Sequence, residues 1–175
     1  MKITVITVTK NRCAMLSRAV NSFLSQVYDD KQLIIIDGAS EDGSIQFLNN
    51  LKHDEIKWIS EEDSGIYDAL NKGIRLAEGE IIGVLHSDDF YYDDNVLCRV
   101  ANAFRDQKDL DFVSGSTLYV SNNSSTQISR VYNSAYFKKW MLRFGFIPSH
   151  TATFFKYALV ERLGGYNLKY KSYLM

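Results

Sequence analysis

Apolar residues recur in two alternating patterns along the first hundred positions. Short runs rich in Val and Ile predict strands at 3–8, 33–37, 56–60 and 81–85, of which 33–37 and 81–85 are predicted to be buried. Between them, apolar residues repeat every three or four positions and predict helices at 15–27, 45–51, 66–77 and 96–104. Strands that alternate with helices are typical of βαβ units, and continuous apolar strands indicate a sheet covered on both faces. We therefore predict an α/β fold with a mainly parallel central sheet flanked by helices.

The pattern changes after residue 111. The sequence predicts two strands, at 112–120 and 128–132, which are joined by a polar turn at 121–125. A further strand is predicted at 152–155 and a short helix at 159–163. We find no linker or internal repeat, and the length of 175 residues fits one domain over 1–175.

An aromatic and basic stretch at 136–146 has two interpretations. Its Lys138, Lys139 and Arg143 lie among Trp140 and other aromatics, which suits an anionic membrane surface or a lipid-diphosphate acceptor. The alternative, which we favour, is a helix whose aromatics fill the core while its lysines are solvated.

Composition narrows the classes of function. A net charge of −1 argues against nonspecific nucleic-acid binding, which needs a basic surface. No apolar run approaches the ~20 residues that span a bilayer, and the first residues do not resemble a signal peptide. Cys13 and Cys98 have no metal-ligand spacing, so reduced cysteines in a cytoplasmic protein are the simplest interpretation.

Polar residues follow each of the four parallel strands. They occur at 9–11, 37–38, 60–63 and 87–89, and the carboxyl ends of parallel strands meet at one edge of a sheet, where ligands bind. Asp88 and Asp89 are adjacent carboxylates that would repel each other there, and a divalent cation such as Mg²⁺ or Mn²⁺ would offset that repulsion. The alternative is a solvated strand end or a helix cap.

The usual glycine-rich phosphate loops are absent. The first strand is followed by Thr9-Lys10-Asn11-Arg12, so neither a dinucleotide fingerprint nor a P-loop is present. A metal at Asp89 is therefore the better candidate for screening a diphosphate.

Five segments resemble the ordered motifs of family 2 glycosyltransferases. They are TVTKNR at 7–12, IIDGASEDG at 35–43, DSGIYDALNKG at 63–73, EGEIIG at 78–83 and SDD at 87–89. The resemblance continues weakly through 148–155 and 163–166. It implies a GT-A-like fold of the nucleotide-diphospho-sugar transferase type, a nucleotide-sugar donor, a divalent metal and inversion at the anomeric carbon. The 63–73 motif resembles the branch that builds bacterial surface polysaccharides.

The resemblance also implies roles for the residues at the strand ends. Asp89 would bind the metal, Asp88 would lie near the ribose hydroxyls, and Asp37 matches a position that contacts the base. Thr9 matches the wall of the nucleobase pocket. Simpler alternatives are that Asp37 initiates the turn after its strand and that Thr9 is an ordinary strand residue.

Four further residues complete the predicted site. Thr7 and Asn11 belong to the first motif and are assigned to the donor site with it, and Asn71 aligns with a family asparagine near the nucleotide. His150 is a candidate for contact with the acceptor or the diphosphate. His86 is expected to be structural, although it stands close to the predicted metal site.

The catalytic base is the missing part of the pattern. The resemblance implies an Asp or Glu soon after Gly164-Gly165-Tyr166, but no carboxylate follows Glu161. We therefore identify no catalytic residue and expect the base to lie beyond Met175. On this view, 1–110 form the nucleotide-sugar-binding part, 111–175 form an incomplete acceptor-side part, and the chain turns over poorly or not at all.

The expected partners follow from the family. They are a UDP-sugar as the common donor, Mn²⁺ or Mg²⁺, and a saccharide or lipid-linked acceptor. On the membrane interpretation of the stretch at 136–146, the chain would be cytoplasmic and associate peripherally with the inner face of the plasma membrane. Exposed apolar surface would favour a homodimer. Competing hypotheses are a noncatalytic nucleotide-sugar-binding fragment, a nucleotidyltransferase, which lacks its glycine-rich basic loop here, and a receiver domain, whose late-strand lysine we cannot place.

Overall fold

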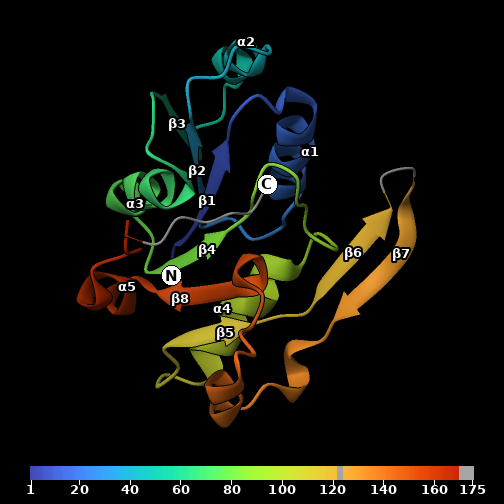
Figure 1. Ribbon diagram of the computed structural model, residues 1–175, viewed down its shortest axis with the longest axis vertical. Helices are drawn as coiled ribbons and strands as arrows, with labels where there is room; N and C mark the ends of the chain where they lie inside the picture. Colours follow the sequence, from blue (N-terminus) through green and yellow to red (C-terminus); the bar gives the residue numbers. More distant parts are fainter. Residues whose placement is uncertain (122–123, 170–175) are drawn as a thin grey trace.

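The structure is a computed structural model that describes residues 1–121 and 124–169 (Figure 1). A six-stranded sheet runs through its centre in the order β3-β2-β1-β4-β8-β5. Its parallel strands are β1 (Ile3–Thr9), β2 (Lys31–Asp37), β3 (Ile56–Ser60) and β4 (Ile81–Val84). These pairings confirm the predicted mainly parallel central sheet. The strands run in the same direction because one helix joins each of them to the next.

Helices cover both faces of the sheet (Figure 1). The connecting helices are α1 (Cys13–Leu24), α2 (Ser44–Asn50) and α3 (Ile66–Leu76), and α4 (Val96–Asp106) follows β4. Side chains of α1, α2 and α4 form one buried cluster with Ile3 and Val5 of β1. Ile6, whose side chain lies on the opposite face, packs instead with Leu70 of α3. Alternate residues of one strand therefore serve two cores, which explains the unbroken apolar runs.

Close packing of α3 on the sheet depends on one glycine. A Cβ built on Gly73 would lie 2.4 Å from Cγ2 of Ile6, so no larger residue fits without displacing the strand. The result is a helix held tightly against β1, with its polar amino-terminal end near the carboxyl ends of the strands.

The sheet is completed by antiparallel strands from the second part of the chain. β8 (Thr153–Lys156) pairs with β4, and β5 (Phe112–Ser114) pairs with β8. Phe154 of β8 packs directly on Gly83 of β4, since a Cβ there would lie 2.3 Å from its ring. α5 (Tyr157–Leu163) follows β8 and packs on the same face as α3.

The predicted single strand at 112–120 is wrong. The chain leaves the main sheet after Ser114, and Gly115 donates its N–H to the carbonyl of Ala152 at 2.7 Å. The remainder forms β6 (Thr117–Ser121), which pairs with β7 (Ser124–Tyr132) in a separate two-stranded sheet. Figure 1 shows this hairpin extending away from the main sheet. Part of the predicted turn at 121–125 lies outside the described residues.

The predicted core helix at 136–146 is also wrong. Short 3-10 turns replace it, η1 (Ser134–Tyr136) and η2 (Lys139–Phe144), followed later by η3 (His150–Ala152). Trp140 is 59% exposed and Phe144 71% exposed, so these aromatics do not fill a core. Within the described ranges, none of the helices combines the length and apolar character needed to cross a bilayer.

Candidate nucleotide-sugar site

The acidic loop after β4 lies at the carboxyl edge of the sheet. Leu85 continues beside β1 by donating its N–H to Ile6, and the Asp89 N–H closes a turn on the carbonyl of His86 at 3.0 Å. Burial, followed by the neighbouring charge of Asp88, raises the pKa of Asp89 to about 6. Such a carboxylate is destabilised when ionised, which is the environment that a cation would relieve.

Two arginines hold this loop against α1. Arg12 makes a 3.3 Å ion pair with the carboxylate of Asp88, and Arg18 donates to the Asp88 carbonyl at 3.4 Å. The Arg18 guanidinium also lies 4.1 Å from the centre of the Phe90 ring. Both ends of the Arg12–Asp88 pair are about half exposed, so the pair orients the carboxylate more than it stabilises the fold.

Asp37, at the end of β2, is fully buried. Its carboxylate accepts hydrogen bonds from the Ser40 N–H at 2.9 Å, the Ser40 hydroxyl at 2.5 Å and the Ser60 hydroxyl at 2.7 Å. Asp37 therefore joins the ends of β2 and β3 and organises the turn between β2 and α2. This is the role that the simpler alternative assigned to it, while contact with a base stays a prediction.

The loop after β1 is tied to the same turn. Asn11 adopts a left-handed conformation at φ 54° and donates its N–H to the Ser40 hydroxyl at 2.7 Å. Its side-chain oxygen accepts the Glu41 N–H at 2.7 Å. In the structure, Asn11 thus fixes the shape of the rim from both its backbone and its side chain.

Two of the three threonines of β1 differ from these hydrogen-bonded residues. The side-chain hydroxyls of Thr7 and Thr9 are buried and have no hydrogen-bond partner among the described residues. Thr9 is 7% exposed and is the last residue of β1, level with Asp37 in the neighbouring strand. An unpaired buried hydroxyl is costly, so the Thr9 hydroxyl is a group that a ligand could satisfy.

His150 meets His86 at the rim. Their Nε2 atoms are 2.8 Å apart, so one ring donates its N–H to the other. Burial, then the adjacent His150, lowers the pKa of His86 to about 4, and desolvation lowers the pKa of His150. Both rings are thus neutral at neutral pH, and the pair joins η3 to the acidic loop across 64 residues of sequence.

The side-chain hydrogen bonds of Asn71 go to Tyr166, in the turn that follows α5. Its amide donates to the Tyr166 carbonyl at 2.8 Å and accepts the Tyr166 N–H at 2.8 Å. The rings of Tyr67 and Tyr166 stack beside this link, with centroids 5.4 Å apart. Asn71 therefore fastens the Gly164–Tyr166 turn to α3, and a contact with the nucleotide stays a prediction.

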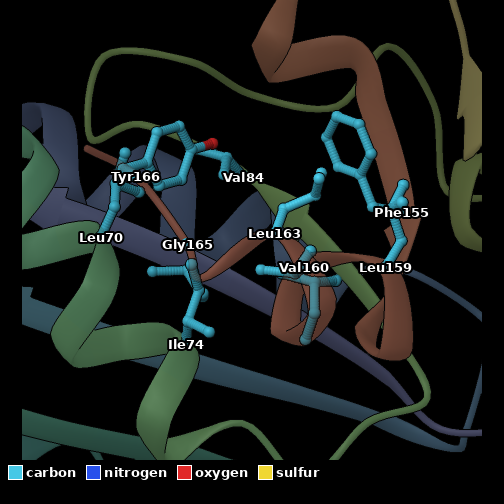
Figure 2. A pocket seen from close by; sticks show the side chains of 11 residues that line it. Leu70, Ile74, Val84, Phe155, Leu159, Val160, Leu163, Gly165 and Tyr166 are labelled. Carbon is cyan, nitrogen blue, oxygen red and sulfur yellow. The ribbon is translucent and has the colours of Figure 1, made fainter.

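An apolar cavity of about 170 Å³ lies behind this turn, between α3, α5 and the sheet (Figure 2). Its lining is Ile6, Leu70, Ile74, Ile82, Val84, Phe155, Leu159, Val160, Leu163, Gly165 and Tyr166. Apart from Tyr166 and Gly165 this lining is aliphatic or aromatic and has no charged group to meet a diphosphate, so the polar rim, and not this cavity, is the candidate nucleotide site.

The sequence reasoning missed the residues that support the site. Arg12, Arg18, Ser40 and Ser60 were not among the predicted site residues, although Arg12 stands in the first motif. A signal was available for Arg12, because a cation after the first strand faces the acids after the fourth strand on the same edge of the sheet.

The donor set at the rim fits a hard divalent cation. Asp88 and Asp89 supply carboxylate oxygens, and the described residues contain no cluster of three or more His, Cys, Asp or Glu side chains able to hold a metal alone. Mg²⁺ and Mn²⁺ at nucleotide sites usually take one or two carboxylates and complete their coordination with substrate phosphates. The site is therefore suited to a metal that arrives with a diphosphate.

Comparison with known proteins places the chain in a family. The model of glycosyl transferase family 2 matches residues 4–163, and the chain belongs to this family. An uncharacterized glycosyltransferase of Mycobacterium tuberculosis is 30% identical over 171 residues, which cover 96% of this chain and 63% of the relative. A PGL/p-HBAD biosynthesis glycosyltransferase of the same organism is 29% identical, covering 95% of this chain and 64% of the relative. The chain thus spans less than two thirds of the length of these relatives.

Solved structures show the fold. TarS 1–349 of S. aureus has a TM-score of 0.76 at 21% identity, covering 99% of this chain and 52% of that chain. A mannosyltransferase of Pyrobaculum calidifontis, solved with GDP-Man and Mn²⁺, has a TM-score of 0.68 at 20% identity, covering 95% and 47%. TarS has also been solved with UDP-GlcNAc. The predicted GT-A-like fold is confirmed.

Proposed function

We propose that this chain carries the donor site of a glycosyltransferase that moves a sugar, with inversion, from a nucleoside-diphosphate sugar to a saccharide or lipid-linked acceptor in polysaccharide synthesis. The observation that carries the proposal is the pair Asp88 and Asp89 at the carboxyl edge of the sheet, where the pKa of Asp89 is raised. Family membership, and relatives solved with UDP-GlcNAc or with GDP-Man and Mn²⁺, support it.

Each group at the rim has a task in this proposal. Asp89 would hold Mn²⁺ or Mg²⁺, which as a Lewis acid neutralises the charge that a diphosphate leaving group gathers. Asp88 would give up its ion pair with Arg12 and accept hydrogen bonds from ribose hydroxyls instead. Arg12 would then be free to face a phosphate. The unpaired hydroxyl of Thr9 would take a polar group of the nucleobase.

The remaining groups shape the rim in this proposal. Asp37 and Asn11 keep the loops after β1 and β2 in one arrangement, which lowers the cost of ordering them around a ligand. His150, held by His86, would face the diphosphate or the acceptor from the opposite side. Residues 1–110 would thus bind the donor, and residues 111–175 would contribute to the acceptor side.

Calorimetric titration with UDP, GDP, CDP and ADP, each with and without Mn²⁺, tests the donor site directly. One nucleotide should bind at least about tenfold more tightly with Mn²⁺, because cation and diphosphate bind as a unit. Asp89→Asn should abolish this dependence on Mn²⁺. Asp109→Asn, a matched change of an exposed carboxylate outside the site, should leave it intact.

The result also separates the competing hypotheses. Binding that is equal with and without Mn²⁺, or unchanged in Asp89→Asn, would overturn the proposal. The corresponding triphosphates are titrated in the same way, and metal-dependent binding of triphosphates but not of diphosphates would favour a nucleotidyltransferase instead.

A further inference from the structure

The segment from 134 to 147 presents a surface whose large apolar side chains face solvent. We call it the aromatic-basic surface. Its exposed members are Tyr136 at 77%, Trp140 at 59%, Leu142 at 49%, Phe144 at 71%, Phe146 at 55% and Ile147 at 68%. Single exposed apolar residues are ordinary, but six within twelve positions form a group that usually marks an interaction surface.

The segment has a defined shape. The rings of Trp140 and Phe144 meet edge to face at 6.0 Å between centroids, while both stay exposed. Gly145 ends η2 with φ 78°, a conformation that favours glycine, and the Tyr132 hydroxyl donates to the Ile147 carbonyl at 2.7 Å. The exposed side chains are therefore presented on a backbone that is fixed at both ends.

The charged residues of the chain segment that carries this surface have one sign. No Asp or Glu occurs anywhere between Asp111 and Glu161, whereas the same stretch contains Arg130, Lys138, Lys139, Arg143 and Lys156. By contrast, residues 1–111 hold 20 acidic and 12 basic residues. Cations among exposed aromatics complement a surface that is negative and has an apolar interior beneath it.

We propose that the aromatic-basic surface docks on an anionic lipid bilayer. Trp and Tyr favour the level of the lipid headgroups, Phe and Leu reach the acyl boundary, and Lys and Arg attract anionic headgroups. A protein partner would bury the aromatics equally well, but only a strongly acidic one would account for the absence of acidic residues over the whole 112–160 stretch.

Docking would also place the rim beside the bilayer. Only Pro148 and Ser149 separate Ile147 from His150, whose ring contacts His86 next to the acidic loop. A docked chain would thus hold its candidate site within reach of an acceptor embedded in lipid. This last step rests on the proposed function, whereas bilayer binding itself does not.

Sedimentation with vesicles tests the docking. The chain should bind vesicles of phosphatidylcholine mixed with phosphatidylglycerol about tenfold more tightly than pure phosphatidylcholine, and added salt should weaken the binding. The double variant Trp140→Ser, Phe144→Ser should lose binding to both kinds of vesicle. The double variant Lys138→Glu, Arg143→Glu should lose the preference for phosphatidylglycerol.

Matched variants on the acidic part of the chain provide the controls. Tyr92→Ser removes an aromatic that is 75% exposed, and Lys52→Glu reverses an exposed cation, and neither should change vesicle binding. The surface variants should keep wild-type circular dichroism and wild-type nucleotide affinity, so loss of docking is separable from failure of the donor site. No binding to anionic vesicles, or binding that the surface variants do not weaken, would overturn the proposal. The proposal would also be overturned if the chain did not bind vesicles but self-associated with rising concentration in ultracentrifugation, and if Trp140→Ser combined with Phe144→Ser abolished that self-association.

Discussion

Residues 1–111 and the described residues after them share one sheet but differ in how far they bury their apolar side chains. In the first part, β1, β2 and β4 are buried between helices and β3 forms a partly exposed edge, and the carboxyl ends of these four parallel strands bring polar side chains to a single rim. In the second part, β8 and β5 extend that sheet and Phe154 joins its core, while the hairpin and the 3-10 turns expose much of their apolar surface. The difference indicates that the first part is built around its own core and the second part around surfaces.

Charge separates the two parts in the same way. Residues 1–111 hold 20 of the 21 acidic residues, and residues 112–175 hold only one, against 8 basic residues. A net charge of −1 therefore conceals two strongly charged parts of opposite sign. Composition averaged over a chain excludes nucleic-acid binding poorly in such a case, and it hides a surface suited to an anionic partner.

The largest effect is expected at Asp37, which holds the rim of the first part together. Asp37→Ala would leave the Ser40 N–H, the Ser40 hydroxyl and the Ser60 hydroxyl without their buried acceptor. We expect the free energy of unfolding in urea to fall by about 3–5 kcal/mol. Asp109→Ala, at an exposed position, should change it by less than about 0.5 kcal/mol. A loss below about 1 kcal/mol for Asp37→Ala would show that the rim is not built on this carboxylate.

A smaller loss is expected at the junction of the two parts. Gly83→Ala would place a methyl group 2.3 Å from the Phe154 ring, where β4 meets β8. Overpacking of this kind should cost about 2–3 kcal/mol of unfolding free energy. In a double-mutant cycle, Phe154→Leu should recover part of that loss by making room for the methyl group. Strictly additive effects would mean that the second part does not pack on β4 as described.

Hydrophobic spacing was sufficient to predict the first part because each of its strands is short, apolar and followed by one helix. The same reasoning failed at Gly115, where the chain passes from the main sheet to the hairpin and the Gly115 N–H is donated to the Ala152 carbonyl. It failed again at Trp140, because spacing cannot tell an aromatic that fills a core from one that faces solvent.

In the candidate site, too, some features could be predicted from the sequence and others could not. The convergence of strand ends follows from topology, so Asp88 and Asp89 could be placed at the rim from sequence. The contacts that hold them could not, since Arg18 and the His86–His150 pair depend on side-chain geometry between distant segments. Which of Thr9, Asp37 and Asn71 meets a ligand is likewise decided by hydrogen bonds that spacing does not encode.

A gain in stability is expected at Asp89. Its folded pKa of about 6 lies above the usual value of 3.8, so the folded state binds a proton more strongly than the unfolded state does. The ionised carboxylate therefore destabilises the fold, fully above pH 6, and progressively less as the pH falls from 6 towards 4. Asp89→Asn should raise the free energy of unfolding at pH 8, without metal, by about 1–2 kcal/mol, and should leave it nearly unchanged at pH 4.

Thermal melting with a metal chelator at both pH values measures this difference. An Asp88→Asn variant provides the control, because the Asp88 carboxylate is half exposed and its removal should have a smaller effect. Destabilisation by Asp89→Asn at pH 8 would contradict the description of Asp89 as a carboxylate whose ionised form is destabilised by burial, and with it the reason for expecting a cation there.

The smallest effect is expected on the aromatic-basic surface, and its smallness is informative. Trp140 and Phe144 are both more than half exposed, so Trp140→Ser combined with Phe144→Ser should change the unfolding free energy by less than about 0.5–1 kcal/mol. Phe154→Ala, which removes an aromatic that is 3% exposed, should cost about 3–5 kcal/mol in the same urea titration. Large aromatics that contribute little to folding carry a cost in solubility, so they are expected to serve binding. If the surface variant is destabilised as strongly as Phe154→Ala, these aromatics belong to a core in solution, and the contrast between the two parts of the chain does not hold.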